Sequence, residues 1–382
     1  MRFLHTADWH LGRIFHGRSL IEDQAHVLDQ FVALVRDARP DAVLIAGDVY
    51  DRAVPPAEAV SLLDDTLSRI VLGEGVPVVM IAGNHDSPDR LGFGARLLAA
   101  HGLTIAGRID APQAGVSFDD AWGRVVVHPL PYAEPAAVRD ALATDIAGHE
   151  AAMAALLERV RAAHPAGARS VLVAHAFVAG GAESESERPL SIGGSGAVDA
   201  ALFSGFDYVA LGHLHRPQRA GAEQVRYAGS LLKYSLSEAE HAKSVSLVEL
   251  GAPGELKIEH IALSPRRDLR RLSGTLDEVL AAARVDAARE DYIFASLHDR
   301  GALLDPMAKL REVYPNVLGC ERTVLSHSGE AAVAVGRARE LDTRALFGDF
   351  FREVAGEALD TAASDALDAS LQALADARRE AS

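Results

Sequence analysis

The sequence feature that most constrains the fold is a short apolar run that ends abruptly in polar residues. Residues 78–82 are five consecutive apolar side chains, followed directly by Gly83, Asn84, His85 and Asp86. A run of this length is too short for a free-standing helix and is typical of a strand buried on both faces. Because Gly83 permits a sharp turn, the three polar side chains should lie just beyond the carboxyl end of that strand.

The same arrangement recurs four more times along the chain. A short strand-like run precedes each of these sets: Asp8 and His10, Asp48 and Asp51, His175 alone, and His213 and His215. In layered α/β proteins the carboxyl ends of neighbouring strands meet at one crevice. We therefore expect these side chains, although distant in sequence, to gather at one site.

This collection of side chains suits divalent metal ions. Imidazoles, carboxylates and one amide favour manganese, iron or zinc over calcium, which takes oxygen ligands, and over a structural zinc site built from thiolates. Cys320 is the only cysteine, which excludes thiolate sites. The set is too large for one ordinary ion, whereas two ions about 3.5–4 Å apart with a shared carboxylate would use it fully. The sequence therefore predicts a dinuclear site.

Each position also has an ordinary structural explanation. A single histidine such as His10 or His175 is often a hydrogen-bonded structural residue, and a single Gly-Asp or Gly-Asn pair is common in turns. Chance would have to place five such sets, each after its own apolar run. We therefore interpret the set as functional.

Longer sequence words surround these residues. They include HTADWHLG, AGDVYDR, IAGNHDS, SESERPLSIGGS, ALGHLHRPQ and YAGSLLKYSLSEAEH. The order of the metal-type motifs resembles the calcineurin-like metallophosphoesterase superfamily, and the flanking words resemble its SbcD family, the nuclease subunits of bacterial SbcCD complexes. The resemblance is strong over residues 1–250 and looser to the end.

The resemblance implies a role for each site residue. One ion would be held by Asp8, His10, Asp48 and His215, and the other by Asp48, Asn84, His175 and His213. Asp48 would be the bridge. His85 would be the acid that protonates the departing oxygen or stabilises the transition state, with Asp86 holding its ring. Archaeal and eukaryotic relatives often have histidine at the position of Asp51, which is therefore expected to support the ligands. Mn²⁺ is the expected metal, with Mg²⁺ as an alternative.

Apolar periodicity predicts an α/β architecture in several parts. The strand and helix patterns of residues 1–265 predict a two-sheet β-sandwich flanked by helices, which the resemblance identifies as the metallophosphoesterase nuclease domain. Helical patterns within it cover 20–39, 57–72, 93–100 and 134–164. Residues 266–325 alternate strand and helix patterns and resemble the small α/β capping domain of the family. A linker at 326–342 precedes a C-terminal helical segment, 343–382.

Two segments bear on substrate and partner. The Gly-, Ser- and Glu-rich stretch 178–200 has too few apolar groups to pack by itself, so it either closes over substrate or forms a surface excursion. In the terminal segment, apolar side chains predict two amphipathic helix faces: Leu346, Phe347, Phe350, Phe351 and Val354, then Leu367, Leu371 and Leu374. By resemblance they would dock an SbcC-type ATPase, which fits the absence of a G-x-x-x-x-G-K nucleotide loop.

The charge balance limits how such a protein can hold DNA. The net charge is −16 at pH 7, which argues against a protein that coats DNA unaided, because Lys and Arg dominate non-specific affinity. A partner is therefore expected to supply much of the DNA contact. The one concentrated basic stretch, Arg266, Arg267, Arg270 and Arg271, is either a phosphate contact or an ordinary solvated charge run.

The remaining expectations concern context and alternatives. No apolar run approaches the ~20 residues of a membrane span, and the single cysteine fits a reducing compartment, so we expect a cytoplasmic protein. The resemblance implies DNA ends and hairpins as substrates and a homodimer made by helices 57–72 and 93–100. The alternatives are a phosphomonoesterase or cyclic-nucleotide phosphodiesterase with the same metals, and a DNA-end scaffold with vestigial chemistry.

Overall fold

The computed structural model of the 382-residue chain describes all residues except 110–114, 191–195, 300–302, 324–342 and 381–382. It divides into two units, Met1–Asp268 and Leu269–Ser382. None of the helices in the described part of the chain is both long and apolar enough to cross a membrane.

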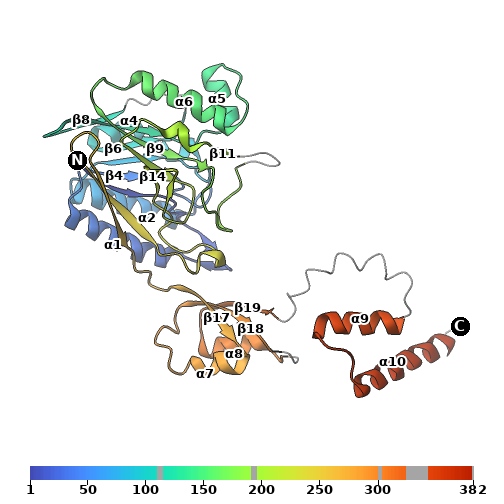
Figure 1. The fold of residues 1–382 in the computed structure, drawn as a ribbon. Helices are drawn as coiled ribbons and strands as arrows, with labels where there is room; N and C mark the ends of the chain where they lie inside the picture. Colours follow the sequence, from blue (N-terminus) through green and yellow to red (C-terminus); the bar gives the residue numbers. More distant parts are fainter. Residues whose placement is uncertain (110–114, 191–195, 300–302, 324–342, 381–382) are drawn as a thin grey trace. The chain divides into compact units, whose positions relative to one another are not determined.

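The first unit is built on two six-stranded sheets (Figure 1). One sheet has the order β16-β15-β1-β4-β5-β6, and its strands are β1 (Arg2–Thr6), β4 (Ala42–Ile45), β5 (Val78–Ile81), β6 (Leu103–Ala106), β15 (Ser244–Leu250) and β16 (Leu256–Ala262). The other has the order β13-β14-β12-β9-β8-β7, with β7 (Val116–Asp120), β8 (Gly123–Leu130), β9 (Arg169–His175), β12 (Tyr208–Gly212), β13 (Gln218–Ala220) and β14 (Ala222–Tyr227). Strands β1, β4, β5 and β6 of the first sheet run parallel, and so do β14, β12, β9 and β8 of the second, which brings the carboxyl ends within each set to one edge.

The core lies between the sheets, and helices cover the outside. Phe3, Leu44 and Val79 of the first sheet pack with Val171 and Tyr208 of the second, all of them buried. Figure 1 shows α1 (Ile21–Ala38) and α2 (Ala57–Ser68) on one side and α5 (Pro135–Leu142) and α6 (His149–Ala163) on the other. The predicted two-sheet α/β sandwich flanked by helices is confirmed, since both strands and covering helices are present.

The predicted helix over 134–164 is wrong as a single element. The chain instead forms α5 and α6, which are separated by a turn. Ala143 ends α5 with a φ of 49°, and Gly148 precedes α6 with a φ of 90°. Both values lie in the left-handed region, which interrupts a right-handed helix. Alanine-rich composition alone did not reveal this break, because alanine favours helix on both sides of it.

Short helices follow the GNHD motif. Residues 93–100 were expected to form one helix, whereas the chain forms α3 (Pro88–Leu91), α4 (Ala95–Leu98) and a 3-10 turn η2 (Ala99–His101). Gly94, with a φ of 73°, separates α3 from α4. The segment therefore presents its apolar side chains from single turns rather than from one continuous helix.

The second unit contains a small α/β module and two terminal helices. Its parallel sheet has the order β17-β18-β19, formed by β17 (Leu269–Gly274), β18 (Tyr292–Leu297) and β19 (Val317–Arg322). Helices α7 (Leu276–Ala282) and α8 (Pro306–Val313) pack on it through a buried cluster that includes Val279, Ile293 and Leu310. Helices α9 (Thr343–Ala355) and α10 (Thr361–Glu380) are joined by an ion pair between Arg344 and Asp368.

Parts of the sequence expectations fall outside the described residues. The expected linker 326–342 lies there, and so do the side chains of Val354 and Leu374. Of the expected apolar face on α9, Leu346, Phe347 and Phe350 are exposed.

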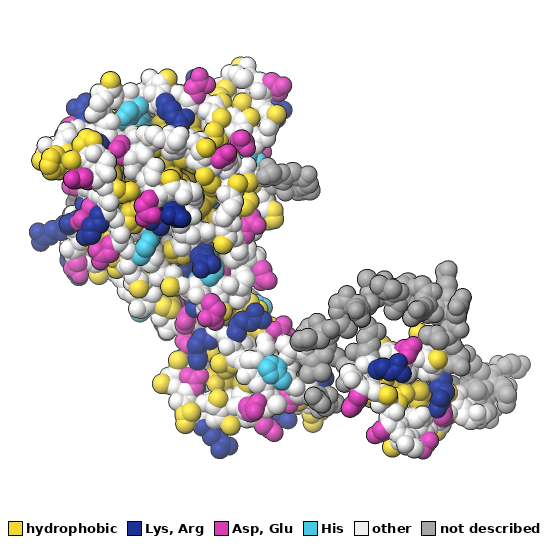
Figure 2. Space-filling model, in the orientation of Figure 1, with side chains coloured by type: hydrophobic (Ala, Val, Ile, Leu, Met, Phe, Trp, Pro, Cys, Tyr) yellow, Lys and Arg dark blue, Asp and Glu magenta, His cyan; other side chains and the backbone are white. Residues whose placement is uncertain are grey.

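The arginines of the basic stretch are paired with carboxylates. Within the first unit, Arg266 contacts Glu22 at 2.5 Å and Arg267 contacts Asp23 at 3.0 Å. In the second unit, Arg270 pairs with Asp286 and Asp291, and Arg271 pairs with Glu321. Figure 2 shows basic and acidic side chains interspersed over the visible face. These arginines therefore fasten local structure, which favours an ordinary charge run over a dedicated phosphate contact.

Candidate metal centre

Five strands deliver the candidate residues to one edge of the sandwich. Asp8 and His10 follow β1, Asp48 follows β4, Asn84 follows β5, His175 ends β9, and His213 and His215 follow β12. Four of these residues have positive φ angles: Asp8 (53°), His10 (45°), Asp48 (49°) and His213 (110°). Such conformations are costly for residues other than glycine and tend to occur at functional sites. The backbone is therefore strained where these side chains meet.

Two glycines allow the loops to approach this closely. A Cβ added at Gly83 would lie 2.2 Å from Asp48 Oδ1, and one at Gly212 would lie 2.0 Å from the carbonyl oxygen of Ala46. Both distances are far below a van der Waals contact, so any larger residue would push the loops apart. The glycines in the GNHD and GHLH motifs are thus required by packing around Asp48 and β4.

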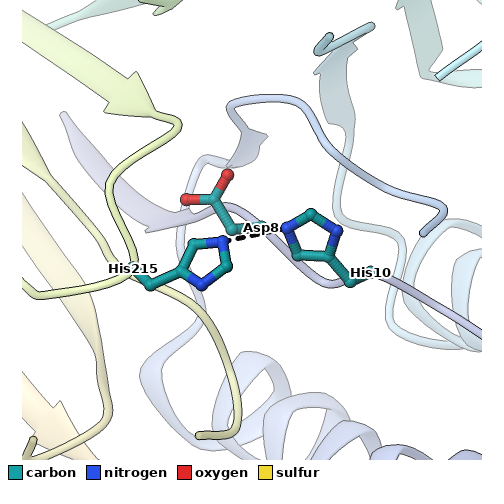
Figure 3. Close-up of side chains that lie close together, drawn as sticks. All are labelled: Asp8, His10 and His215. Carbon is teal, nitrogen blue, oxygen red and sulfur yellow. Dashed lines mark hydrogen bonds between the residues drawn. The ribbon is translucent and has the colours of Figure 1, made fainter. Parts of the chain in front are cut away.

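Asp8, His10 and His215 form the first ligand group (Figure 3). Their ligand atoms all lie within 4.8 Å of one another, and all three side chains are buried. The Nε2 atoms of His10 and His215 are 3.0 Å apart. The carboxylate of Asp8 is held by the backbone N–H of His213, at 2.9 Å. Two ring nitrogens that face one point beside a carboxylate suit a bound cation.

Asn84, His175 and His213 form the second ligand group. The side-chain oxygen of Asn84 lies 2.9 Å from His175 Nε2 and 3.3 Å from His213 Nδ1. His175 and His213 also lie with Asp48 in a cluster whose ligand atoms are within 4.8 Å of one another. This group thus places an amide oxygen and two imidazoles around a second point.

Asp48 lies between the two groups. Its Oδ2 is 3.8 Å from His10 Nε2 and 3.5 Å from His175 Nε2. Its Oδ1 accepts a hydrogen bond from the backbone N–H of His85 at 2.8 Å. One carboxylate therefore reaches both groups, as a shared ligand of two ions requires.

The proton positions and charges also fit metal binding. His175 Nδ1 lies 2.9 Å from the carbonyl oxygen of Ala46 and must donate to it, because a carbonyl only accepts. Its Nε2 lone pair consequently faces the centre. Burial lowers the pKa values of His10, His175 and His213, so that these rings are neutral at pH 7, as ligands must be.

The buried carboxylates of the centre repel one another. Burial, together with the charge of Asp48, raises the pKa of Asp8 well above its usual range. Two cations at this position would offset the repulsion between these carboxylates. The residues present therefore fit a pair of divalent ions.

Comparisons with known proteins agree with this geometry. Residues 1–217 match the family model described as calcineurin-like phosphoesterase, and residues 265–355 match one described as type 5 capsule protein repressor C-terminal domain, SbcD_C. The chain is 33% identical over 377 residues, 98% of each chain, to the SbcD subunit of the nuclease SbcCD from Staphylococcus saprophyticus. The chain belongs to the SbcD nuclease family of calcineurin-like phosphoesterases. Membership in this family makes it a metal-dependent phosphoester hydrolase.

Two solved structures are also similar to this chain. A dimetal phosphatase from Danio rerio is 14% identical with a TM-score of 0.44, covering 69% of this chain and 96% of its own. A hypothetical protein from Thermus thermophilus is 13% identical with a TM-score of 0.39, covering 69% of this chain and all of its own.

In this SbcD-family chain, Asp86 is a clamp between loops. Its carboxylate accepts hydrogen bonds from the backbone N–H groups of Val49 (3.0 Å), Tyr50 (2.9 Å) and Gly83 (2.9 Å). Burial and the nearby Asp48 raise its pKa to about 7. Asp86 was expected to hold the ring of His85; in the structure its carboxylate instead joins the loop after β4 to Gly83.

The ring of His85 is held by the loop after β4 instead. Its Nδ1 lies 2.9 Å from the backbone carbonyl oxygen of Asp51, and its Nε2 lies 4.0 Å from Asp48 Oδ2. The His85 side chain is 13% exposed, whereas that of His10 is fully buried. His85 is thus the histidine at the centre that is both oriented and open to solvent.

The side chain of Asp51 lies beside His10 and His85, and one potential ligand atom of each of the three lies within 4.8 Å of the others. Its Oδ1 is 2.9 Å from Arg13 Nη1 and 3.6 Å from His10 Nδ1. The guanidinium of Arg13 also lies over the ring of Tyr234, 5.5 Å from the ring centre. Asp51 therefore places negative charge beside the outer nitrogen of His10.

Sequence reasoning missed four residues that contact His215: Ser186, Glu187, Glu238 and Lys243. They follow no apolar strand, so the rule that found the other residues does not apply to them. The sequence signal that could have indicated them is the pair of segments SESER and SEAEH, which lie outside the metal motifs. Near the two ends of the stretch 178–200, β10 (Phe177–Val178) pairs with β11 (Ala197–Val198), and Ser186 between them contacts His215.

Proposed function

We propose that this SbcD-family chain is the nuclease subunit of an ATP-dependent SbcCD-type complex in the cytoplasm. It cuts DNA as a double-strand exonuclease and as a single-strand and hairpin endonuclease, in repair, replication and recombination. The observation that carries the proposal is the carboxylate of Asp48, which reaches both ligand groups from between them.

The ligand sets follow the two groups. Asp8, His10, Asp48 and His215 hold one ion, and Asp48, Asn84, His175 and His213 hold the other. Mn²⁺ is the metal we expect, with Mg²⁺ as the alternative. When bound, the pair supplies Lewis-acid chemistry, which offsets the negative charge of a phosphodiester and makes water nucleophilic at neutral pH.

His85 supplies the proton for the departing oxygen. Its Nδ1 proton is engaged by the carbonyl oxygen of Asp51, so the transferable proton is carried on Nε2 when the ring is an imidazolium. Nε2 lies on the side of Asp48, and the ring is partly open to solvent. An acid in this position is typically worth roughly 10²- to 10⁴-fold in rate.

Exposed apolar side chains support the proposed partners. On α9, Leu346, Phe347 and Phe350 are exposed, and we assign this face to docking of an SbcC-type ATPase. Val60 of α2 and Leu97 of α4 are also exposed, and we assign these elements to the contact of a homodimer. The module 266–325 would act as a capping domain that selects which DNA reaches the metals.

One assay tests the proposal. Purified chain with Mn²⁺ or Mg²⁺ is offered hairpin DNA, linear duplex, single strands and p-nitrophenyl phosphates, with and without an SbcC-type ATPase and ATP. We expect cleavage of duplex ends and hairpins that increases with the ATPase. Preference for the small esters would instead favour a phosphomonoesterase or phosphodiesterase, and metal binding without any cleavage would favour a DNA-end scaffold.

A further inference from the structure

Two sequence words without an assigned role meet at one metal-site residue. Ser186, from SESER, has its Oγ 2.7 Å from His215 Nδ1. Glu238, from SEAEH, has its Oε1 3.2 Å from the same nitrogen. Glu187 accepts a hydrogen bond from the backbone N–H of His215 at 2.7 Å. Both the ring and the backbone of this histidine are therefore held from outside the metal centre.

A buried lysine completes the arrangement. Lys243 Nζ lies 2.5 Å from Glu238 Oε2 and donates to the carbonyl oxygen of His215 and to Ser230 Oγ, each at 2.8 Å. Glu238 is fully buried, and Lys243 is 7% exposed. Because each charge has its partner, the pair can remain buried without a net charge.

These contacts decide which nitrogen of His215 faces the centre. Glu238 and the Ser186 oxygen accept a hydrogen bond from Nδ1–H of His215, since an ionised carboxylate only accepts and the Ser186 hydroxyl donates its own hydrogen to Glu238. The Nε2 lone pair of His215 then faces the centre, where His215 Nε2 lies 3.0 Å from His10 Nε2. In the second ligand group, by contrast, the outer nitrogen of His175 is held by the neutral carbonyl of Ala46. A carboxylate partner raises the basicity of a ligating imidazole more than a carbonyl does.

We propose that Ser186, Glu187, Glu238 and Lys243 form a positioning network that fixes His215 and makes the first ligand group the tighter of the two metal sites. This inference rests on the proposed dinuclear site. Ions then fill the first site before the second. The network also links the stretch 184–187 to metal affinity, because its contacts with His215 exist only while that stretch is in place.

The test removes the buried charge pair as a unit. The double variant Glu238→Gln/Lys243→Met leaves no unpaired buried charge, which single substitutions would. In the full-length chain, Mn²⁺ affinity is measured by two-site calorimetry, and pairing of the ions by Mn²⁺ electron paramagnetic resonance. We expect one affinity to fall by roughly 10- to 100-fold, the range found for lost outer partners of ligands, while the other is unchanged. The spin-coupled signal should then require more Mn²⁺.

A matched control separates this role from general stabilisation. Lys233→Met removes a different lysine that fastens the same segment, through the carbonyl oxygen of Ala239 at 2.6 Å and Asp268 at 2.8 Å. Neither of these contacts involves His215, so both Mn²⁺ affinities should stay at their original values. Equal losses of affinity in this control and in the double variant would overturn the proposal.

A smaller change guards against loss of folding. Ser186→Ala deletes only the hydroxyl between His215 and Glu238, and it should weaken the first site by several-fold while leaving the circular dichroism spectrum unchanged. Folded variants with two unchanged affinities would show that the network is only structural. If the original chain itself bound no pair of ions, the proposed dinuclear function would fail instead, and the two failures are thus distinguishable.

Discussion

The two ligand groups of the metal centre differ in what surrounds them. Asp8, His10 and His215 are buried and backed by the network around Glu238. Asn84, in the second group, is only partly buried and lines an open pocket of about 580 Å³ together with Tyr132 and other residues. Enclosure favours retention of an ion, and an open pocket favours access by substrate. The two groups therefore differ in their surroundings rather than in the burial of their histidines, because His175 and His213 are as buried as the histidines of the first group and only Asn84 reaches the pocket.

The largest expected effect comes from the residue that belongs to both halves. Asp48→Ala should weaken both metal sites, because Asp48 Oδ2 lies within 4 Å of a histidine in each group. Its cost in DNA cleavage should exceed the roughly 10²- to 10⁴-fold expected for loss of a general acid. Metal content by mass spectrometry and cleavage rates check this. If the variant kept two tightly bound ions, the shared-ligand assignment would be wrong.

The next effect should separate chemistry from metal binding. His85→Ala removes the proposed acid, which contacts the carbonyl of Asp51 and belongs to neither ligand group. We expect the rate to fall by about 10²- to 10⁴-fold, with two ions still bound. Single-turnover cleavage and metal content are measured on the same sample. A parallel fall in both quantities would contradict the role of His85.

A smaller effect should be confined to the first ligand group. Asp51→Asn removes the negative charge that lies 3.6 Å from His10 Nδ1 and that pairs with Arg13. We expect Mn²⁺ affinity at the first site to fall by up to roughly 10- to 100-fold, with the second site unaffected. Two-site calorimetry checks this, with Asp41→Asn, just before the amino end of β4, as a control. A loss of Mn²⁺ affinity at the second site alone would contradict the assignment of Asp51 to the first ligand group.

The smallest effect concerns histidines that do not belong to the centre. Burial, and then the neighbouring His164, lower the pKa of His128 to about 4. The unfolded chain, with a pKa near 6.5, therefore binds more protons between about pH 4 and pH 6.5, so stability falls as the pH decreases through this range. Chemical denaturation of metal-free chain at several pH values should show a shallower slope for His128→Gln. An identical slope would show that His128 does not contribute.

The sequence identified most of the residues that the fold gathers at the candidate metal centre, because their signals are local. Strands buried on both faces are continuous apolar runs, and the ligands follow them within a few residues, as Asp48 and Asn84 do. Edge strands such as β16, with its alternating exposed side chains, have no such run and were missed. The break between α5 and α6 was not predicted, because it depends on the positive φ angles of Ala143 and Gly148 rather than on a pattern of apolar residues.

The residues that orient the candidate ligands could not be predicted from apolar runs. Glu238 contacts His215 although it is 23 residues away in the sequence, and no periodic pattern in the sequence predicts that contact. Asp86 binds backbone amides of Val49 and Tyr50, and backbone amides have no signature in a sequence. Local chemistry was therefore predictable, whereas the partners that orient it depended on tertiary packing.

The central claim is that one carboxylate is shared by two differently held metal sites. Crystals of the chain grown with Mn²⁺ should be measured at a wavelength where manganese scatters anomalously. We predict two anomalous peaks, one beside the first ligand group and one beside the second, with Asp48 in contact with both. A single peak, or two peaks of which only one contacts Asp48, would contradict this account.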